Sequence, residues 1–192
     1  MLAYIFWHRP EPTVEQAAYE HALEQFHRSL AHRPPVGLRA SGALRAPELP
    51  WLGSAPGYED WYLLDDWAAV GVLEEAAVSH GHVTAHDGVA SRAGPGTGAV
   101  YRLIEGHPQL PNTRLAVWVE RPAGHEYLSL EALLGDGMDP AASCLWRRCI
   151  ALGPAPELCL LTTAESPAGV GPQRLPGGWT AHAFAREALW HD

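Results

Sequence analysis

The apolar positions along the chain predict alternating strands and helices, and one strand pattern occurs twice. Residues 2–10 form a run of aliphatic and aromatic side chains that ends at Arg-Pro, and residues 115–122 repeat it from Leu-Ala to Arg-Pro. Proline has no amide proton and disfavours helix in the residue before it, so both runs are predicted to be strands ending at that point. Neither run alternates cleanly between apolar and polar residues. We therefore expect both faces of each strand to be covered.

The rest of the first half follows the order strand, helix, strand, strand, helix, strand. Apolar residues recur at helical spacing in two segments, and β-branched, aromatic or alternating residues mark the strands. Residues 80–98 show little periodicity and are expected to form a loop. The predicted strands are residues 2–10, 37–46, 58–64 and 99–104, and the predicted helices run from Val14 to the prolines at 34 and 35 and from 67 to 79.

The second half repeats this order with weaker helices. Its predicted strands are residues 114–120, 143–152, 158–163 and 179–189, with a short helix at 126–134. Residues 166–178 are rich in proline and glycine where the first half has its second helix. We place the boundary between the halves near residue 112. The alternative is one α+β domain with an unrelated C-terminal extension.

This element order, together with the doubled Leu-Ala…Arg-Pro strand, is similar to that of a known superfamily. A β-α-β-β-α-β unit is the ferredoxin-like arrangement, whose helices cover only one face of its sheet. Two units can lay their bare faces together, so the chain resembles the dimeric α/β-barrel superfamily in its fused form. The resemblance implies an α+β fold of tandem ferredoxin-like repeats, residues 1–112 and 113–192, forming a pseudo-dimeric barrel whose second repeat has degraded helices.

The superfamily includes cofactor-independent oxygenases, haem-binding enzymes similar to chlorite dismutase, and stress-responsive barrels, so the resemblance implies a fold without choosing a function. We therefore expect a barrel protein that is non-catalytic or binds a small molecule. One alternative is a cofactor-independent enzyme, oxygenase-like or isomerase-like, with an acidic or aromatic small substrate. Another is a metal-binding protein.

Charge and composition exclude several partners. The chain has 22 acidic and 13 basic residues, a net charge of −9, which disfavours nucleic acid and anionic membrane surfaces. No apolar stretch approaches the roughly 20 residues of a membrane span. The three cysteines follow no secretory signal, so we expect a reduced, cytoplasmic protein. The chain is expected to be a monomer or a homodimer.

The strongest candidate metal site is the run from His80 to Asp87. His80, His82, His86 and Asp87 could supply ligands for a transition metal such as zinc. The run resembles the metallo-β-lactamase signature only loosely, because its aspartate follows the third histidine. The alternative is a solvated loop without metal, and we expect no cofactor.

Two other cofactor patterns are weak. Cys144, Cys149 and Cys159 lack a fourth thiolate for an iron–sulfur cluster and are expected to be buried structural thiols. Haem binding is disfavoured, because no histidine of the second half lies on a well-formed predicted helix. The three histidines available there are His125, His182 and His191.

The candidate small-molecule site lies on the strands. Arginine beside aromatic rings can hold an acidic or planar ligand through charge-assisted hydrogen bonds and stacking. His8, at the end of the first strand, is the candidate general base. Alternatively, the aromatic residues fill the barrel and the arginines reach solvent at its rim. The candidate ligand-binding residues, all on predicted strands and taken as barrel-facing, are Tyr4, Phe6, Arg39, Arg45 and Trp118.

Overall fold

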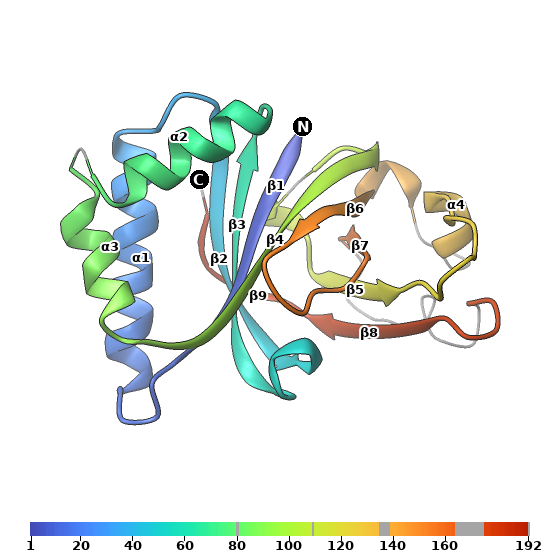
Figure 1. Cartoon of the computed structure of the whole chain (residues 1–192), viewed down its shortest axis with the longest axis horizontal. Helices are drawn as coiled ribbons and strands as arrows, with labels where there is room; N and C mark the ends of the chain where they lie inside the picture. The colour runs from blue at the N-terminus through green and yellow to red at the C-terminus, as the bar shows by residue number, and fades with distance from the viewer. Residues whose placement is uncertain (80, 109, 135–138, 164–174, 192) are drawn as a thin grey trace.

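One curled antiparallel sheet with helices on its outer face forms the fold (Figure 1). The computed structural model describes residues 1–79, 81–108, 110–134, 139–163 and 175–191. The strands are β1 (Leu2–Pro10), β2 (Leu38–Leu49), β3 (Ala55–Leu64), β4 (Ala93–Gly106), β5 (Leu115–Glu120), β6 (Ser143–Ala151), β7 (Leu158–Thr162), β8 (Thr180–Ala185) and β9 (Glu187–His191). The α-helices are α1 (Gln16–His32), α2 (Trp67–Ala77), α3 (Val83–Ala90) and α4 (Leu130–Leu133).

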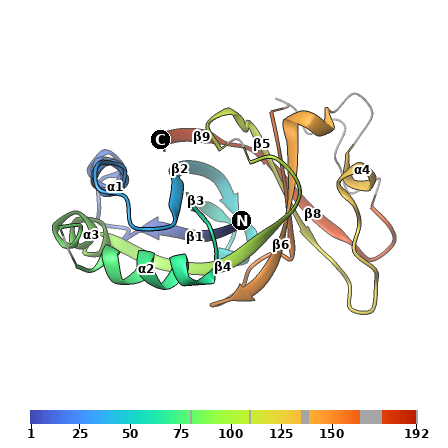
Figure 2. The same ribbon diagram turned by 90° about the horizontal axis from the view of Figure 1, so that it is seen from above.

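A single residue connects the two edge strands of the sheet. The strand order is β8-β5-β7-β6-β4-β1-β3-β2-β9, so the outermost strands β8 and β9 are consecutive in the chain and only Arg186 separates them. The predicted strand 179–189 is thus two strands that pair with opposite edges. The curl of the sheet is clear from above (Figure 2).

Alternate residues of β1 face opposite sides of the sheet. Ala3, Ile5 and Trp7 pack into the cluster inside the curl, whereas Leu2 packs into the cluster beneath the helices and Tyr4 lies against it. Both faces are covered, as the absence of alternation predicted. The prediction that Tyr4 and Phe6 face the barrel interior is wrong, because they lie on the helix side.

The inside of the curl is packed with large aromatic side chains. Trp7, Trp61, Trp118 and Trp146 are fully buried, and their rings meet at centroid distances of 5.1 Å for Trp7 and Trp118 and 5.9 Å for Trp61 and Trp146. Indoles bury more area than any other side chain and prefer tilted or edge contacts. This layer therefore joins the two halves of the sheet through one continuous core.

Helices α1, α2 and α3 cover the outer face of the first half, and α4 lies by the second half (Figure 1). The predicted loop at 80–98 is wrong in part, because it contains α3 and the start of β4. Helix α3 has only eight residues, too few for its periodicity to show, and no helix of this length is stable alone. Its partly buried Ala85 and Val89 pack on the core beneath the helices, which supplies the missing stability.

The prediction of an α+β fold is confirmed at the level of one nine-stranded curled antiparallel sheet with few helices. The helix predicted at 126–134 is reduced to α4. Most of the proline- and glycine-rich segment 166–178 lies outside the described residues. Within the described part of the chain, no helix combines the length and apolarity needed to cross a membrane.

Candidate functional site

A buried carboxylate on the helix side of β3 organises the candidate site. Asp60 is 4% exposed and lies opposite Phe6 of β1. His8 Nε2 is 3.1 Å from Asp60 Oδ2, and His27 Nε2, from α1, is 3.4 Å from Asp60 Oδ1. Tyr62 donates to Asp60 Oδ2 at 3.3 Å. Three elements thus converge on one carboxylate.

Each histidine is held by a hydroxyl group on its other nitrogen. Tyr19 Oη is 2.5 Å from His8 Nδ1, and Ser41 Oγ is 3.0 Å from His27 Nδ1. The side chains therefore form two hydroxyl–imidazole arms that share Asp60, the order of groups that orients the imidazole in hydrolase triads. We call these five residues, Tyr19, His8, Asp60, His27 and Ser41, the Asp60 cluster.

The electrostatics of the cluster keep its carboxyl group charged and its phenol neutral. Burial by itself would raise the pKa of Asp60, but the charges and hydrogen bonds of His8 and His27 outweigh burial and hold that pKa well below its usual range. Burial, and then the charge of Asp60, raise the pKa of Tyr19 far above that of free tyrosine. Tyr19 therefore stays protonated, and its hydroxyl group can donate a hydrogen bond to His8 Nδ1.

A cavity of about 220 Å³ lies between the sheet and the helices, with Asp60 in its wall. Its sheet side is aromatic, with Tyr4, Phe6 and Tyr62, and Phe26 comes from α1. Gly96 and Gly98 of β4 give these rings room, because a Cβ at Gly96 would lie 2.6 Å from Phe6 Cζ. The remaining wall residues, from α2 and α3, are Leu73, Glu74, Ala77, His86, Val89 and Ala90.

The cavity wall holds two carboxyl groups, Asp60 and Glu74, and one imidazole, His86. Burial raises the pKa of Tyr4 to about 12, with further contributions from Glu74 and Asp60. Among the residues that the structure describes, no arginine lines the cavity. Two carboxylates facing an aromatic cavity favour a neutral or cationic planar molecule over an anion.

The structure brings together only some of the residues predicted to form the small-molecule site. Tyr4 and Phe6 line the cavity, while His8 is 1% exposed, does not line the cavity, and contacts two of its wall residues, Asp60 and Phe6. Trp118 lies on the opposite side of the sheet, inside the curl. The grouping of Trp118 with Tyr4 in one site is therefore wrong, because the sheet separates them.

The two predicted arginines are already paired with carboxylates. Arg39 makes an exposed two-bond pair with Asp65 at 2.6 and 2.9 Å. Arg45 donates two 2.7 Å bonds to Glu20 and also pairs with Glu187. Arg45 lines a second, more open cavity of about 510 Å³ next to Tyr58, outside the aromatic one. Both guanidinium groups reach the surface, as the alternative to ligand binding predicted.

Sequence reasoning missed the ion pair inside the curl. Arg186 Nε donates to Glu59 Oε2 at 3.1 Å, and both side chains are fully buried. Glu59 also accepts the indole N–H groups of Trp7 at 3.1 Å and Trp118 at 2.9 Å. The available signal was the pair Glu59-Asp60 in an otherwise aromatic strand, where one acid must face each side.

The candidate metal residues do not form a group. His82 Nδ1 lies 3.1 Å from Ser29 Oγ, while His86 Nδ1 pairs with Asp87 at 3.2 Å. His80 lies outside the described residues. Within the described ranges no three His, Cys, Asp or Glu side chains are arranged to hold a metal ion.

The cysteines and the other histidines are dispersed. Cys144 and Cys159 are buried in the core, and burial raises the pKa of Cys144 to about 11, whereas Cys149 is exposed. The prediction of buried thiols is therefore wrong for Cys149. His182 and His191 lie exposed on β8 and β9, and the His125 ring is 6.5 Å from that of Trp179.

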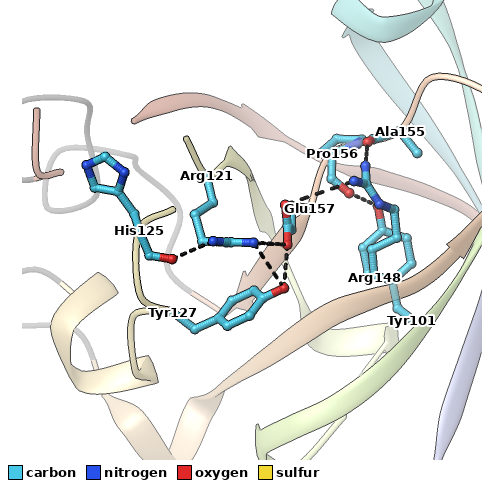
Figure 3. Close-up of polar contacts among 8 residues, drawn as sticks. All are labelled: Tyr101, Arg121, His125, Tyr127, Arg148, Ala155, Pro156 and Glu157. Atoms are coloured by element: carbon cyan, nitrogen blue, oxygen red, sulfur yellow. Dashed lines mark hydrogen bonds and ion pairs between the residues drawn. The ribbon is translucent and has the colours of Figure 1, made fainter. Parts of the chain in front are cut away.

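A second polar network lies in the other half of the sheet (Figure 3). Glu157 accepts from Arg121 at 3.0 Å and from the hydroxyl of Tyr127, and Arg148 Nη2 is 4.0 Å away. Burial by itself would raise the pKa of Glu157, but the hydrogen bonds from Tyr127 and Arg121 and the charges of the arginines together lower it. Arg121 and Arg148 thus balance the charge of Glu157. Arg147, the residue before Arg148, makes no ion pair with Glu157.

Two solved structures share this fold. The chain is similar to a provisionally assigned monooxygenase from Fusobacterium nucleatum, with a TM-score of 0.61 and 9% identity over 100% of this chain and 93% of that one. It is also similar to an anthrone oxidase-like protein, with a TM-score of 0.52 and 10% identity over 98% and 93%. No family model and no curated protein matches the chain. At these identities the likeness shows the fold alone.

Proposed function

We propose that this chain binds a small planar aromatic molecule, neutral or cationic, in the cavity beneath α1, α2 and α3. The observation that carries the proposal is the buried Asp60 cluster opening onto an aromatic cavity. The volume of about 220 Å³ is below the roughly 300–1,000 Å³ of drug-sized pockets, which suits a ligand of one or two rings. Tyr4, Phe6 and Tyr62 would contact its flat faces.

The second half supports a functional role for the Asp60 cluster. There the corresponding layer between sheet and helix is apolar, with Leu115, Val117, Leu145 and Leu158 packed against Leu130. Holding a helix on this sheet thus requires no buried charge. A buried carboxylate is costly unless it is paired, so its presence in one half only is best explained by chemistry.

We propose proton abstraction as that chemistry, in a cofactor-independent oxidation by O₂. A ligand hydroxyl bound at Asp60 would pass its proton to the carboxylate, which the neighbouring imidazoles of His8 and His27 hold in place. His8, fixed by Tyr19, would orient Asp60. The resulting phenolate is the electron-rich form that O₂ oxidises, and the names of the two structural neighbours are consistent with this reaction class.

The proposed architecture is the fused α/β barrel. Strands β4-β1-β3-β2 and β8-β5-β7-β6 stand in the same relative order, the one expected for two ferredoxin-like repeats. We propose residues 1–112 and 113–192 as these repeats. The first repeat would carry the site, and the second repeat would close the barrel.

Three probes of one shape and different charge test the binding proposal by calorimetry. We expect 1-naphthol and N-methylquinolinium to bind saturably, and 1-naphthoate to bind at least about 10-fold more weakly because Asp60 and Glu74 repel it. Ala77→Phe should abolish binding by filling the cavity. Val78→Phe, at an exposed neighbour that does not line the cavity, is the matched control. Tightest binding of naphthoate, or unchanged binding in Ala77→Phe, would contradict the proposal.

Oxygen uptake tests the chemistry separately. With 1,4-dihydroxynaphthalene we expect oxidation to the quinone with one H₂O₂ formed per O₂ consumed, faster than in buffer alone. The rate should fall to that of buffer in Ala77→Phe. Binding without any acceleration would leave a small-molecule binding protein and end the oxidase proposal.

A further inference from the structure

The arginines of this acidic protein are nearly all paired, which makes the exceptions informative. Most described arginines bond a carboxylate or a backbone carbonyl, as Arg28, Arg39, Arg45, Arg121, Arg148, Arg186, Arg9 and Arg92 do. In the described part of the chain, the guanidinium groups of Arg102, Arg114 and Arg147 have no hydrogen-bond or ion-pair partner. Unpaired cations in a chain of net charge −9 are unexpected, since carboxylates are abundant.

Two of these three arginines lie directly opposite each other on neighbouring strands. Arg102 of β4 pairs in register with Arg147 of β6, so both side chains leave the same face of the sheet. Directly opposite Cβ atoms are about 5 Å apart, and like charges at such positions destabilise a sheet. The two like charges therefore repel each other, and an anion bound between the two guanidinium groups would relieve that repulsion.

The surrounding network holds Arg147 in place without neutralising it. The Arg147 guanidinium carbon lies 4.7 Å from the centre of the Tyr127 ring, and that of Arg121 lies 4.3 Å from the same ring. Tyr127 is fixed in turn by its bond to Glu157, which is shared with Arg121 (Figure 3). The cation–π contact orders the Arg147 side chain in advance, which lowers the entropy cost of binding an anion.

An apolar contact lies next to this pair on the same face. Ile150 of β6 is opposite Val100 of β4, which lies two residues before Arg102 on the same strand. The Ile150 side chain is 49% exposed. An oxyanion held by the two arginines would therefore have an aliphatic surface beside it. A ligand with an apolar group attached to the anion would contact both.

We propose that Arg102 and Arg147 form an oxyanion-binding site for the phosphate or carboxylate group of a small molecule with an apolar substituent. Guanidinium groups match the geometry of both anions through paired hydrogen bonds. The site lies on the β4–β6 strand pair and is separate from the aromatic cavity. It does not depend on the proposed function of that cavity.

The test measures the melting temperature at low ionic strength while inorganic phosphate, phenyl phosphate or benzoate is added. A series with chloride at the same ionic strength is the reference. For the unaltered protein we expect a saturable rise, reached at lower concentration with phenyl phosphate than with inorganic phosphate. Arg102→Gln should raise the melting temperature without ligand, because it removes the like-charge repulsion, and should abolish the ligand-dependent rise. A purely structural arginine would produce a fall on substitution.

The matched control is Arg114→Gln, which removes one equally unpaired positive charge at the residue immediately before β5. We expect it to keep the ligand-dependent rise. Isothermal titration should show phenyl phosphate binding weakened at least about 10-fold by Arg147→Gln and unchanged by Arg114→Gln. The proposal is overturned if no probe saturates below about 50 mM, if Arg114→Gln loses binding equally, or if Arg102→Gln lowers the ligand-free melting temperature.

Discussion

Replacing Glu59 with glutamine is expected to lower the free energy of unfolding by about 3–5 kcal/mol, because it leaves the fully buried Arg186 without its counter-ion. Arg186 is the residue between β8 and β9, where the edges of the sheet meet. The substitution also weakens the acceptor of the Trp7 and Trp118 indole groups. Urea unfolding followed by tryptophan fluorescence measures the change.

Two controls separate this ion pair from a general charge effect. Arg39→Gln removes an exposed ion pair with Asp65 and should change stability little, because solvent screens such pairs. Glu59→Leu combined with Arg186→Met should cost less than Glu59→Gln alone, since no unpaired buried charge remains. A Glu59→Gln protein as stable as the unaltered one would show that the ion pair does not hold the two edges of the sheet together.

Asp60→Asn is expected to abolish the oxidation proposed for the aromatic cavity and to lower the free energy of unfolding at neutral pH by about 1.5–3 kcal/mol, the contribution of hydrogen bonds to a charged group. The asparagine cannot accept the ligand's proton. Its amide group also faces His8 or His27 as a donor where both need an acceptor. Oxygen uptake and urea unfolding measure the two effects.

The pH dependence of the Asp60 contribution has a definite sign. The folded protein holds the pKa of Asp60 well below the roughly 3.9 of an unfolded aspartate. Stability from this group is therefore fully present above about pH 4 and is lost as the pH falls towards the folded pKa. Between about pH 4 and 2 the unaltered protein should lose stability more steeply than Asp60→Asn. Asp65→Asn, at an exposed aspartate, is the control, and identical slopes in all three proteins would contradict the assignment.

Local sequence patterns predicted most strands and the long helices. The Arg-Pro pair ended β1 because proline cannot continue the ladder, and residues 58–64 and 67–79 correspond to much of β3 and to α2. One local prediction failed in part. The loop expected at 80–98 contains helix α3, which was too short to show a period.

The sequence could not predict which face of each strand points into the curl and which points towards the helices. In β1 both sets of alternate residues are apolar, so hydrophobicity does not distinguish the set containing Trp7 from the set containing Phe6. Only the curl of the sheet decides, because it places one set among the buried indoles and the other against α1 and α2. That choice separated Trp118 from Tyr4 and moved the candidate site to the helix side.

The polar clusters depend wholly on tertiary structure. His8, His27 and Asp60 come from three elements, Glu59 and Arg186 are 127 positions apart, and Arg102 meets Arg147 only through strand register. The sequence by itself determined where strands and long helices form, because those depend on neighbours in the chain. Which charges are buried together, and which remain unpaired, was decided by the closing of the sheet, because Coulomb interactions depend on distance in space.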